Sequence, residues 1–396
     1  MKEGWTYKKL GEVCEILNGF AFQSKNYVPE GIRVVRITNV QKGYIEDIDP
    51  KYYPIESKNE LSRYLLKDGD LLLSLTGNVG RVAIIDYSYL PAYLNQRVAC
   101  IRVKENVSLD LNFLFHLLYS KKFERDCIKS SKGAAQLNMS TIWLASYLIP
   151  VPSIEEQRSI VAYLDAAFAH IDALKANAEK QLVEARQLFQ AELAECMRPK
   201  EGWEEKMLGE IATDIYRGSG IKRDQITKEG TPCVRYGEIY TTYNVAFDDC
   251  VSHTCAEIIQ SPKYFEYGDL LFAITGESVE DIGKTIAYLG KDKCLLGGDI
   301  ICMKHKQNPK FLSYAFSTPD AIRQKGIGKT KLKVVHTNAP ALKAISIPIP
   351  PINIQQSIVS RLDALSANIK KLEEVQRKTL AECDALKQAM LREVFE

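Results

Sequence analysis

The sequence predicts a mixed α/β (α+β) protein: two duplicated globular domains joined by two long helices that form an antiparallel coiled coil with pseudo-two-fold symmetry. The main observation is an internal repeat. Pro152–Leu174 and Pro350–Leu372 share the pattern Pro-x-Ile-x-x-Gln-x-Ser-Ile-Val-x-x-Leu-Asp-Ala, with an offset of 350 − 152 = 198 residues in a chain of 396. The other two observations are short β-branched runs before each copy and a long apolar stripe within each copy.

The repeat extends beyond this stretch. Gly4–Ile16 matches Gly202–Ile215, and Leu66–Gly80 matches Phe265–Val279. The chain is therefore a tandem duplication, and each half is a variable globular domain followed by a helical stretch. The predicted parts are residues 1–152, 153–198, 199–350 and 351–396.

The globular domains read as mixed α/β because short apolar runs bounded by polar residues alternate with helical patterns. The predicted strands are Val34–Ile37, Leu71–Leu75, Val82–Ile85, Val98–Val103, Leu270–Ile274 and Ile300–Met303. The predicted helices are Phe113–Arg125 and Phe311–Gln324.

Each helical stretch carries apolar residues at spacings of three and four, which predicts a helix that packs on another helix. Ser153 followed by Glu156 predicts a capping box at the first helix, whereas Asn353 is the expected cap of the second. About 40 residues per helix correspond to roughly 60 Å. The pattern also fits two ordinary domains, each with its own C-terminal helix.

Composition excludes several classes of protein. No apolar run approaches the roughly 18–20 residues of a membrane span, and the polar start lacks the core of a signal peptide. A cytoplasmic protein without membrane partners is therefore expected. The ten cysteines are scattered and form no Cys-x-x-Cys pair, which favours buried reduced thiols.

No catalytic or metal-binding residues are predicted. The Gly-Lys-Thr triplets at Gly283 and Gly328 lack the earlier glycine of a phosphate-binding loop, and no dinucleotide fingerprint follows a strand. Cys250, His253 and Cys255 have no second ligand pair at a zinc-like spacing. The chain itself is expected to be non-catalytic and to hold no cofactor.

Polar, aromatic and basic residues gather at matched places in both halves, which favours nucleic-acid binding. Arginine bonds guanine bidentately, asparagine or glutamine bonds adenine, and lysine suits phosphate. The candidates in the first domain are Asn18, Phe20, Gln23, Lys25, Arg33, Arg36, Asn39, Thr76, Asn78, Arg97, Lys132 and Gln136. Those in the second domain are Arg217, Lys222, Arg223, Arg235, Tyr236, Thr275, Glu277, Lys329 and Lys331. Each stretch taken alone also fits a solvated loop.

Four features together resemble the specificity (S) subunit of type I restriction–modification systems. They are the Leu-Gly-Glu opening of each half, the Gly-Asp-Leu-Leu strand that runs on to Thr-Gly, and the stretches Asn138–Val161 and Glu229–Tyr243. The resemblance covers nearly the whole chain. It implies that residues 1–152 and 199–350 are target-recognition domains, which read the two halves of a bipartite DNA site, and that the helical arms act as a ruler.

The resemblance also implies partners. Two methyltransferase subunits would dock on the helical region and methylate adenine N6, and restriction subunits would join them. S-adenosylmethionine, ATP and Mg would be bound by these subunits. The partner-binding candidates are Glu156, Gln157, Ile160, Leu164, Gln355, Ile358 and Leu362. The second copy departs from the family pattern, because Ile354 stands where the first copy has Glu156.

Three other functions stay open at the level of sequence. The chain could be a helical scaffold that assembles other proteins without reading bases. It could be the S subunit of a methyltransferase-only or type II-like system. An enzyme is the third possibility, and the missing motifs speak against it.

Overall fold

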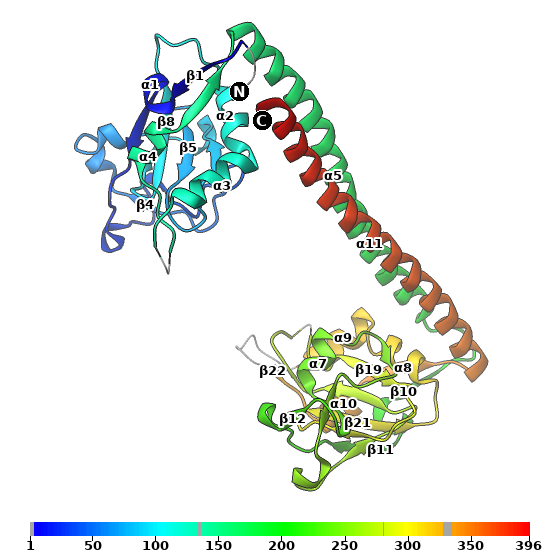
Figure 1. The fold of residues 1–396 in the computed structure, drawn as a ribbon. Helices are drawn as coiled ribbons and strands as arrows, with labels where there is room; N and C mark the ends of the chain where they lie inside the picture. Colours follow the sequence, from blue (N-terminus) through cyan, green and yellow to red (C-terminus); the bar gives the residue numbers. More distant parts are fainter. Residues whose placement is uncertain (1–3, 134–135, 280, 328–334) are drawn as a thin grey trace. The chain divides into compact units, whose positions relative to one another are not determined.

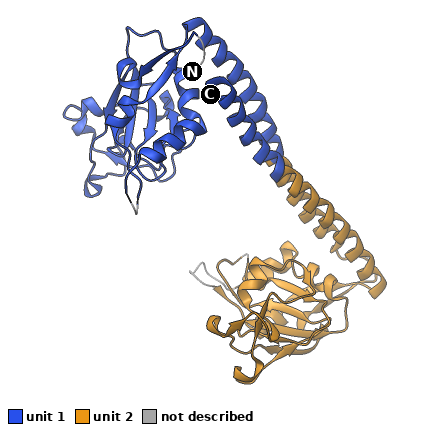
Figure 2. Cartoon of the chain, in the orientation of Figure 1, with its two compact units in different colours: residues 1–178, 377–396 blue, residues 179–376 orange. Residues whose placement is uncertain are grey.

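The computed structural model describes residues 4–133, 136–279, 281–327 and 335–396. It divides into two compact units, residues 1–178 with 377–396 and residues 179–376 (Figures 1 and 2). Each unit contains one globular body and part of each of two long helices, α5 (Ile154–Cys196) and α11 (Ile352–Phe395). The first body precedes α5, and the second body lies between α5 and α11 in the chain.

The first body contains two sheets that pack face to face. The larger sheet has the order β2 (Cys14–Asn18), β8 (Val98–Val103), β5 (Leu71–Ser74) and β6 (Val82–Ile84). The smaller has the order β4 (Tyr52–Tyr53), β3 (Ile32–Val35) and β7 (Ala92–Leu94), and a separate pair joins β1 (Thr6–Lys9) to β9 (Leu148–Val151). The helices are α1 (Leu10–Val13), α2 (Leu111–Tyr119), α3 (Lys121–Ser130) and α4 (Thr141–Ser146).

Alternate side chains of the larger sheet enter two different cores. Leu71 and Ile101 pack with Phe113 and Phe123 of α2 and α3. Leu72 faces the other way and packs with the smaller sheet. The body is thus a layer of helices, a sheet and a second sheet, as the two-residue period of strands requires when both faces are buried.

The second body repeats this arrangement, and each of its two sheets has five strands. One has the order β11 (Ala212–Arg217), β21 (Ile300–His305), β17 (Leu270–Ala273), β19 (Thr285–Tyr288) and β14 (Ala246–Phe247). The other has the order β12 (Ile226–Thr227), β15 (Ser252–Thr254), β13 (Thr231–Val234), β20 (Cys294–Leu296) and β16 (Tyr264–Phe265). Two further pairs are β10 (Glu204–Met207) with β23 (Ser346–Ile349), and β18 (Thr275–Gly276) with β22 (Val335–His336).

The helices of the second body are short. They are α6 (Leu208–Ile211), α7 (Tyr236–Thr241), α8 (Pro309–Ala315), α9 (Pro319–Gly326) and α10 (Ala339–Lys343). Phe272 of the first sheet packs with Phe311 and Phe316, whereas its neighbour Leu271 packs with Val234 of the other sheet. The layer order of the first body therefore recurs.

Two predicted helices are each broken in two, so the single-helix expectations for 113–125 and 311–324 were wrong. Ser120 ends α2, and its hydroxyl accepts a hydrogen bond from Phe123 N–H as the cap of α3. Thr318 caps α9, whose first residue is Pro319. Caps of this kind restart a helix in a new direction, and proline at the first position suits them.

The long helices pair in antiparallel fashion within each unit, which confirms the predicted fold class. In unit 1, Lys175 Nζ lies 2.6 Å from Asp384 Oδ1, and Lys387 Nζ lies 2.5 Å from Asp172 Oδ1. In unit 2, Arg186 pairs with Glu373 and Arg361 pairs with Glu192. Residue numbers rise along one helix as they fall along the other.

The apolar residues predicted at spacings of three and four include Leu174 in the first helix and Leu386 in the second. These two are 55% and 52% exposed, whereas the other predicted stripe residues are buried or half-buried. Ser153 caps α5 as expected, since its hydroxyl accepts from Glu156 N–H, whereas the Glu156 side chain, the other half of the predicted capping box, accepts from Trp5 Nε1. The Asn353 cap was wrong: α11 starts at Ile352, so Asn353 lies within the helix, and the Pro351 carbonyl accepts from Gln355 N–H. Among the described residues, none of the helices is long and apolar enough to cross a membrane.

Candidate nucleic-acid interface

An arginine follows an equivalent strand in each body. Arg36 follows β3 and Arg235 follows β13, and each of these strands pairs in parallel with a strand of the same sheet. Arg36 N–H donates to Asn39 Oδ1 at 2.9 Å, and Arg235 N–H donates to Glu238 Oε2 at 3.0 Å. The backbone therefore turns in the same way after each strand. The predicted strand Val34–Ile37 stops at Val35, which places Arg36 in this turn.

In the second body, the residues at this turn open onto a cleft of about 730 Å³. It brings together three predicted residues, Arg223, Arg235 and Tyr236. The rest of its lining is Gly220, Ile221, Gly237, Glu238, Thr241, Gly297, Gly298 and Asp299. Tyr236 is 41% exposed, so an aromatic face and two guanidinium groups are presented at one place.

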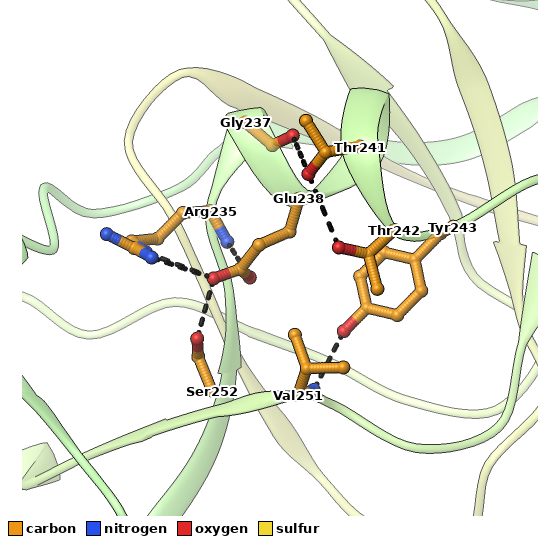
Figure 3. A network of polar contacts seen from close by, with 8 residues as sticks. All are labelled: Arg235, Gly237, Glu238, Thr241, Thr242, Tyr243, Val251 and Ser252. Atoms are coloured by element: carbon orange, nitrogen blue, oxygen red, sulfur yellow. Dashed lines mark hydrogen bonds and ion pairs between the residues drawn. The ribbon is translucent and has the colours of Figure 1, made fainter. Parts of the chain in front are cut away.

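Arg235 is held by a carboxylate that the sequence did not single out (Figure 3). Glu238 Oε1 accepts from Arg235 Nε at 3.1 Å and from Arg235 Nη2 at 3.0 Å. Ser252 Oγ donates to the same oxygen at 2.6 Å. Ser252 lies on β15, 14 residues further along the chain, so no local pattern could have indicated this contact.

The cleft of the first body is about 540 Å³ and lies between the turn after β3 and the turn after β5. It gathers the predicted residues Arg36, Asn78 and Gln136. It is also lined by Ile37, Thr38, Gln41, Glu46, Ile48, Asp49, Gly77 and Arg81. Sequence reasoning missed Arg81, whose Nη1 donates to Gln41 Oε1 at 2.5 Å.

Arg36 is oriented differently from Arg235. Its Nη2 donates to the Asp49 carbonyl at 2.6 Å and lies 3.7 Å from the Asp49 carboxylate. A hydrogen bond from Lys51 lowers the pKa of the Asp49 carboxyl, with smaller contributions from the charges of Lys51 and Arg36. Arg36 is thus attached to an exposed acidic loop rather than to a buried carboxylate.

Three predicted DNA contacts make a hydrogen bond or an ion pair within the protein. Asn39 is 4% exposed and donates to the Glu46 carbonyl, so its expected base contact was wrong: the amide is used to shape the turn. Thr275 is 9% exposed, and its hydroxyl lies 3.1 Å from His336 Nδ1. Arg33 pairs with Asp47 at 3.0 Å and covers the ring of Tyr89.

Other candidates are placed outside the two cleft linings. The exposed ones are Asn18, Gln23, Lys25, Arg97, Lys132, Arg217, Lys222 and Glu277. Arg217 pairs with Asp299 at 2.8 Å, and so lies at the edge of the second cleft. Phe20 is half-buried against Phe22 and Tyr64. Lys329 and Lys331 lie outside the described residues.

The two glutamines predicted to bind partners are instead buried at the junction of arm and body. Gln157 accepts from Asp110 N–H at 2.8 Å and donates to the carbonyls of Ser108 and Pro152. Gln355 accepts from Asn308 N–H at 2.9 Å and donates to Gln307 and Pro350. Both are 0% exposed, so neither side chain can also touch a partner, and that expectation was wrong.

The other partner-binding candidates divide by exposure. Leu164 and Leu362 are fully buried and Ile358 is 8% exposed, so they pack each helix on its own body. Ile160 is half-buried in the same way. Glu156 is exposed and accepts a hydrogen bond from Trp5 Nε1 at 2.8 Å. Of the predicted docking residues, Glu156 is therefore the one that presents a polar group to solvent.

A second pair of contacts fixes each helix to its body. His116 Nε2 lies 2.7 Å from Asp165 Oδ1, and Tyr314 Oη donates to Asp363 at 2.8 Å. Burial lowers the pKa of His116, and the hydrogen bond with Asp165 opposes this shift. In the part of the chain that the structure describes, no group of three or more His, Cys, Asp or Glu residues could hold a metal ion.

Comparisons with known proteins agree on one family. The model of the type I restriction modification DNA specificity domain matches the chain twice, at residues 2–185 and 200–382. The chain is 23% identical to the type I restriction enzyme EcoKI specificity subunit of Escherichia coli K12, over 100% of this chain and 89% of that one. It is 30% identical to the MjaVIII specificity subunit of Methanocaldococcus jannaschii, over 46% of this chain and 44% of that one.

Solved structures share the fold. One is a chain from a structure of the type I R-M system, solved to show complex assembly and conformational transition. Its TM-score is 0.74 at 21% identity, covering 100% of this chain and 98% of that chain. The HsdS subunit from Thermoanaerobacter tengcongensis gives a TM-score of 0.56 at 20% identity, covering 100% of this chain and 97% of that one.

Proposed function

Because this chain belongs to the family of type I restriction–modification DNA specificity proteins, we propose that it reads a bipartite DNA site, with one globular body for each half-site. The observation that carries the proposal is the double match of a DNA specificity domain, once in each half of the chain. Duplicated readers that differ in their cleft residues suit a target with two different halves.

The chemistry of the two clefts supports this proposal. Arg36 and Arg235 occupy equivalent turns, and arginine is the side chain that most often bonds guanine in the major groove. Gln41, Asn78 and Gln136 add amide groups to the first cleft, and amides suit adenine. The second cleft has no amide among its described lining residues. We therefore expect the two bodies to prefer different bases.

Partners are proposed from the same family membership. Relatives are described as specificity subunits of type I restriction enzymes, which implies separate subunits for the chemistry. We propose that two methyltransferase subunits bind the helical arms and supply S-adenosylmethionine chemistry at adenine N6. Restriction subunits would supply ATP-dependent, Mg-dependent cleavage. This chain would position them without taking part in catalysis, in the cytoplasm where the DNA lies.

The experiment is a genome-wide map of N6-methyladenine in cells that produce this chain with its methyltransferase subunit. A split recognition sequence that is lost when the chain is deleted is the expected result. A continuous sequence, or methylation that persists without the chain, would reject the proposal. DNA binding by the full complex that depends on salt but not on sequence would favour a scaffold instead. Methylation of the site with no cleavage of unmethylated DNA would indicate a methyltransferase-only system.

A further inference from the structure

We propose that Glu238 is a positioning residue that fixes Arg235 to read a guanine in the half-site bound by the second body. This inference rests on the proposed function and assigns the base class that this cleft reads.

Three of the four hydrogen bonds printed for the Glu238 carboxylate come from Arg235, and the fourth comes from Ser252 (Figure 3). One oxygen accepts from the Arg235 backbone and so caps α7. The other accepts from Nε and Nη2 of Arg235 and from Ser252 Oγ. The Glu238 side chain is only 9% exposed, and charge-assisted bonds of this kind are about twice as strong as neutral ones. The guanidinium therefore has one preferred orientation.

The opposite edge of Arg235 remains available. Among the described residues, none accepts a hydrogen bond from its Nη1, and the side chain is 32% exposed in the cleft. The free edge of a guanidinium carries two parallel N–H groups. Guanine presents two adjacent acceptors, O6 and N7, in the major groove, and this pair fits the free edge.

Charge favours a base over a phosphate as the target. A buried carboxylate in a DNA-facing cleft repels phosphates, and paired with Arg235 it cancels most of that side chain's attraction for them. The pairing leaves the hydrogen-bond geometry of the guanidinium intact. An ion pair with little net charge and with donors in a fixed geometry is suited to reading a base edge rather than to holding the DNA backbone.

The first body lacks this device. Asn39 occupies the place of Glu238 and keeps only the backbone bond to Arg36. Its amide nitrogen is turned to the Glu46 carbonyl, and Arg36 reaches the exposed Asp49 instead. Glu238 thus accounts for a difference between the two bodies at an equivalent arginine.

The test uses the full chain in complex with its methyltransferase subunit and a DNA library with both half-sites randomised. The variants are Glu238→Gln, Ser252→Ala and Arg235→Lys. Glutamine keeps the shape and can still cap α7, but its amide N–H groups face the donors of Arg235. Glu210→Gln is the matched control, since Glu210 caps α6 in the same body without contacting an arginine side chain.

The wild-type complex is expected to prefer guanine at one position of one half-site. Glu238→Gln and Arg235→Lys should each reduce that preference by roughly 10-fold and leave all other positions unchanged. Ser252→Ala should reduce it less, and Glu210→Gln not at all. Thermal unfolding of each variant checks that the second body folds; should Glu238→Gln be unfolded, Ser252→Ala and Arg235→Lys carry the test.

Two results would overturn the inference. In one, the variants weaken binding to every sequence equally, which identifies Arg235 as a phosphate contact. In the other, the lost preference is for a base other than guanine. A wild-type complex without sequence preference would instead reject the proposed function, so the two failures are distinguishable.

Discussion

Asp70 and Asp269 show what the repeated Gly-Asp-Leu-Leu motif does at the scale of single residues. Asp70 is 4% exposed, accepts from Lys67 N–H, and is bonded at 2.7 Å by both Nε and Nη2 of Arg102. Asp269 accepts from Glu266 N–H and from Lys304 Nζ in the same way. The motif is structural in both bodies, and the sequence alone could not separate it from a binding motif.

Asp70→Ala should lower the free energy of unfolding of unit 1 by about 3 kcal/mol, because it leaves the half-buried Arg102 without its partner. Asp68→Ala, an exposed neighbour, is the control and should change little. Chemical denaturation measures both. Equal effects of the two substitutions would show that the buried pair contributes nothing particular.

His305 makes the stability of the second body depend on pH. Burial lowers the pKa of His305 to about 4, from an ordinary value of 6.5, and its Nδ1 accepts from Gln307 N–H. The unfolded state therefore binds a proton first as the pH falls. Stability from this group is complete above pH 6.5 and is lost as the pH falls toward 4.

We expect unfolding of unit 2 to cost about 2 kcal/mol less at pH 5 than at pH 7 through this group. Denaturation series at both pH values measure the difference. His305→Gln removes the titration and should flatten it. An unchanged slope in this variant would mean that His305 is not the group responsible.

Sequence reasoning found the two arginines but not what orients them. Arg36 and Arg235 stand out by residue type and repeat position. Glu238 reads as an ordinary helix cap until Ser252 is brought to it by the pairing of β13 with β15. Asn39 was misassigned for the complementary reason: an amide that shapes a turn and an amide that reads adenine look alike in sequence.

At the scale of elements, the starts of α5 and α11 explain why the repeated Pro-x-Ile-x-x-Gln pattern exists. The glutamine amide satisfies backbone groups of the body that would otherwise be buried without partners. The apolar period predicted both helices, since it depends on local spacing. The role of the glutamine could not be predicted, because its partners in the globular body lie 47 to 49 residues away.

Gln157→Ala should destabilise the junction of α5 with the first body by about 2 kcal/mol, because Asp110 N–H and two carbonyls lose their partner. Hydrogen exchange at Asp110 is the direct measurement and should become faster. Glu155→Ala, an exposed neighbour on the same turn, is the control. Unchanged protection of Asp110 would contradict this role of Gln157.

At the scale of the whole molecule, the duplication was the strongest signal in the sequence, and the family model matches each half separately. The predicted division at residues 152, 198 and 350 stays a prediction, as do the individual DNA contacts other than that of Asn39. The loops that we propose to read bases differ between the two halves, so a comparison of one half with the other aligns the shared fold and not these loops. The central claim is that each body reads its own half-site.

The most direct test is the N6-methyladenine map of cells that carry the wild-type chain, Arg36→Ala or Arg235→Ala with the methyltransferase subunit. We predict a split sequence for the wild type, relaxed in one half by Arg36→Ala and in the other half by Arg235→Ala. Relaxation of the same half by both substitutions, or of both halves by either one, would contradict the assignment of one body to each half-site.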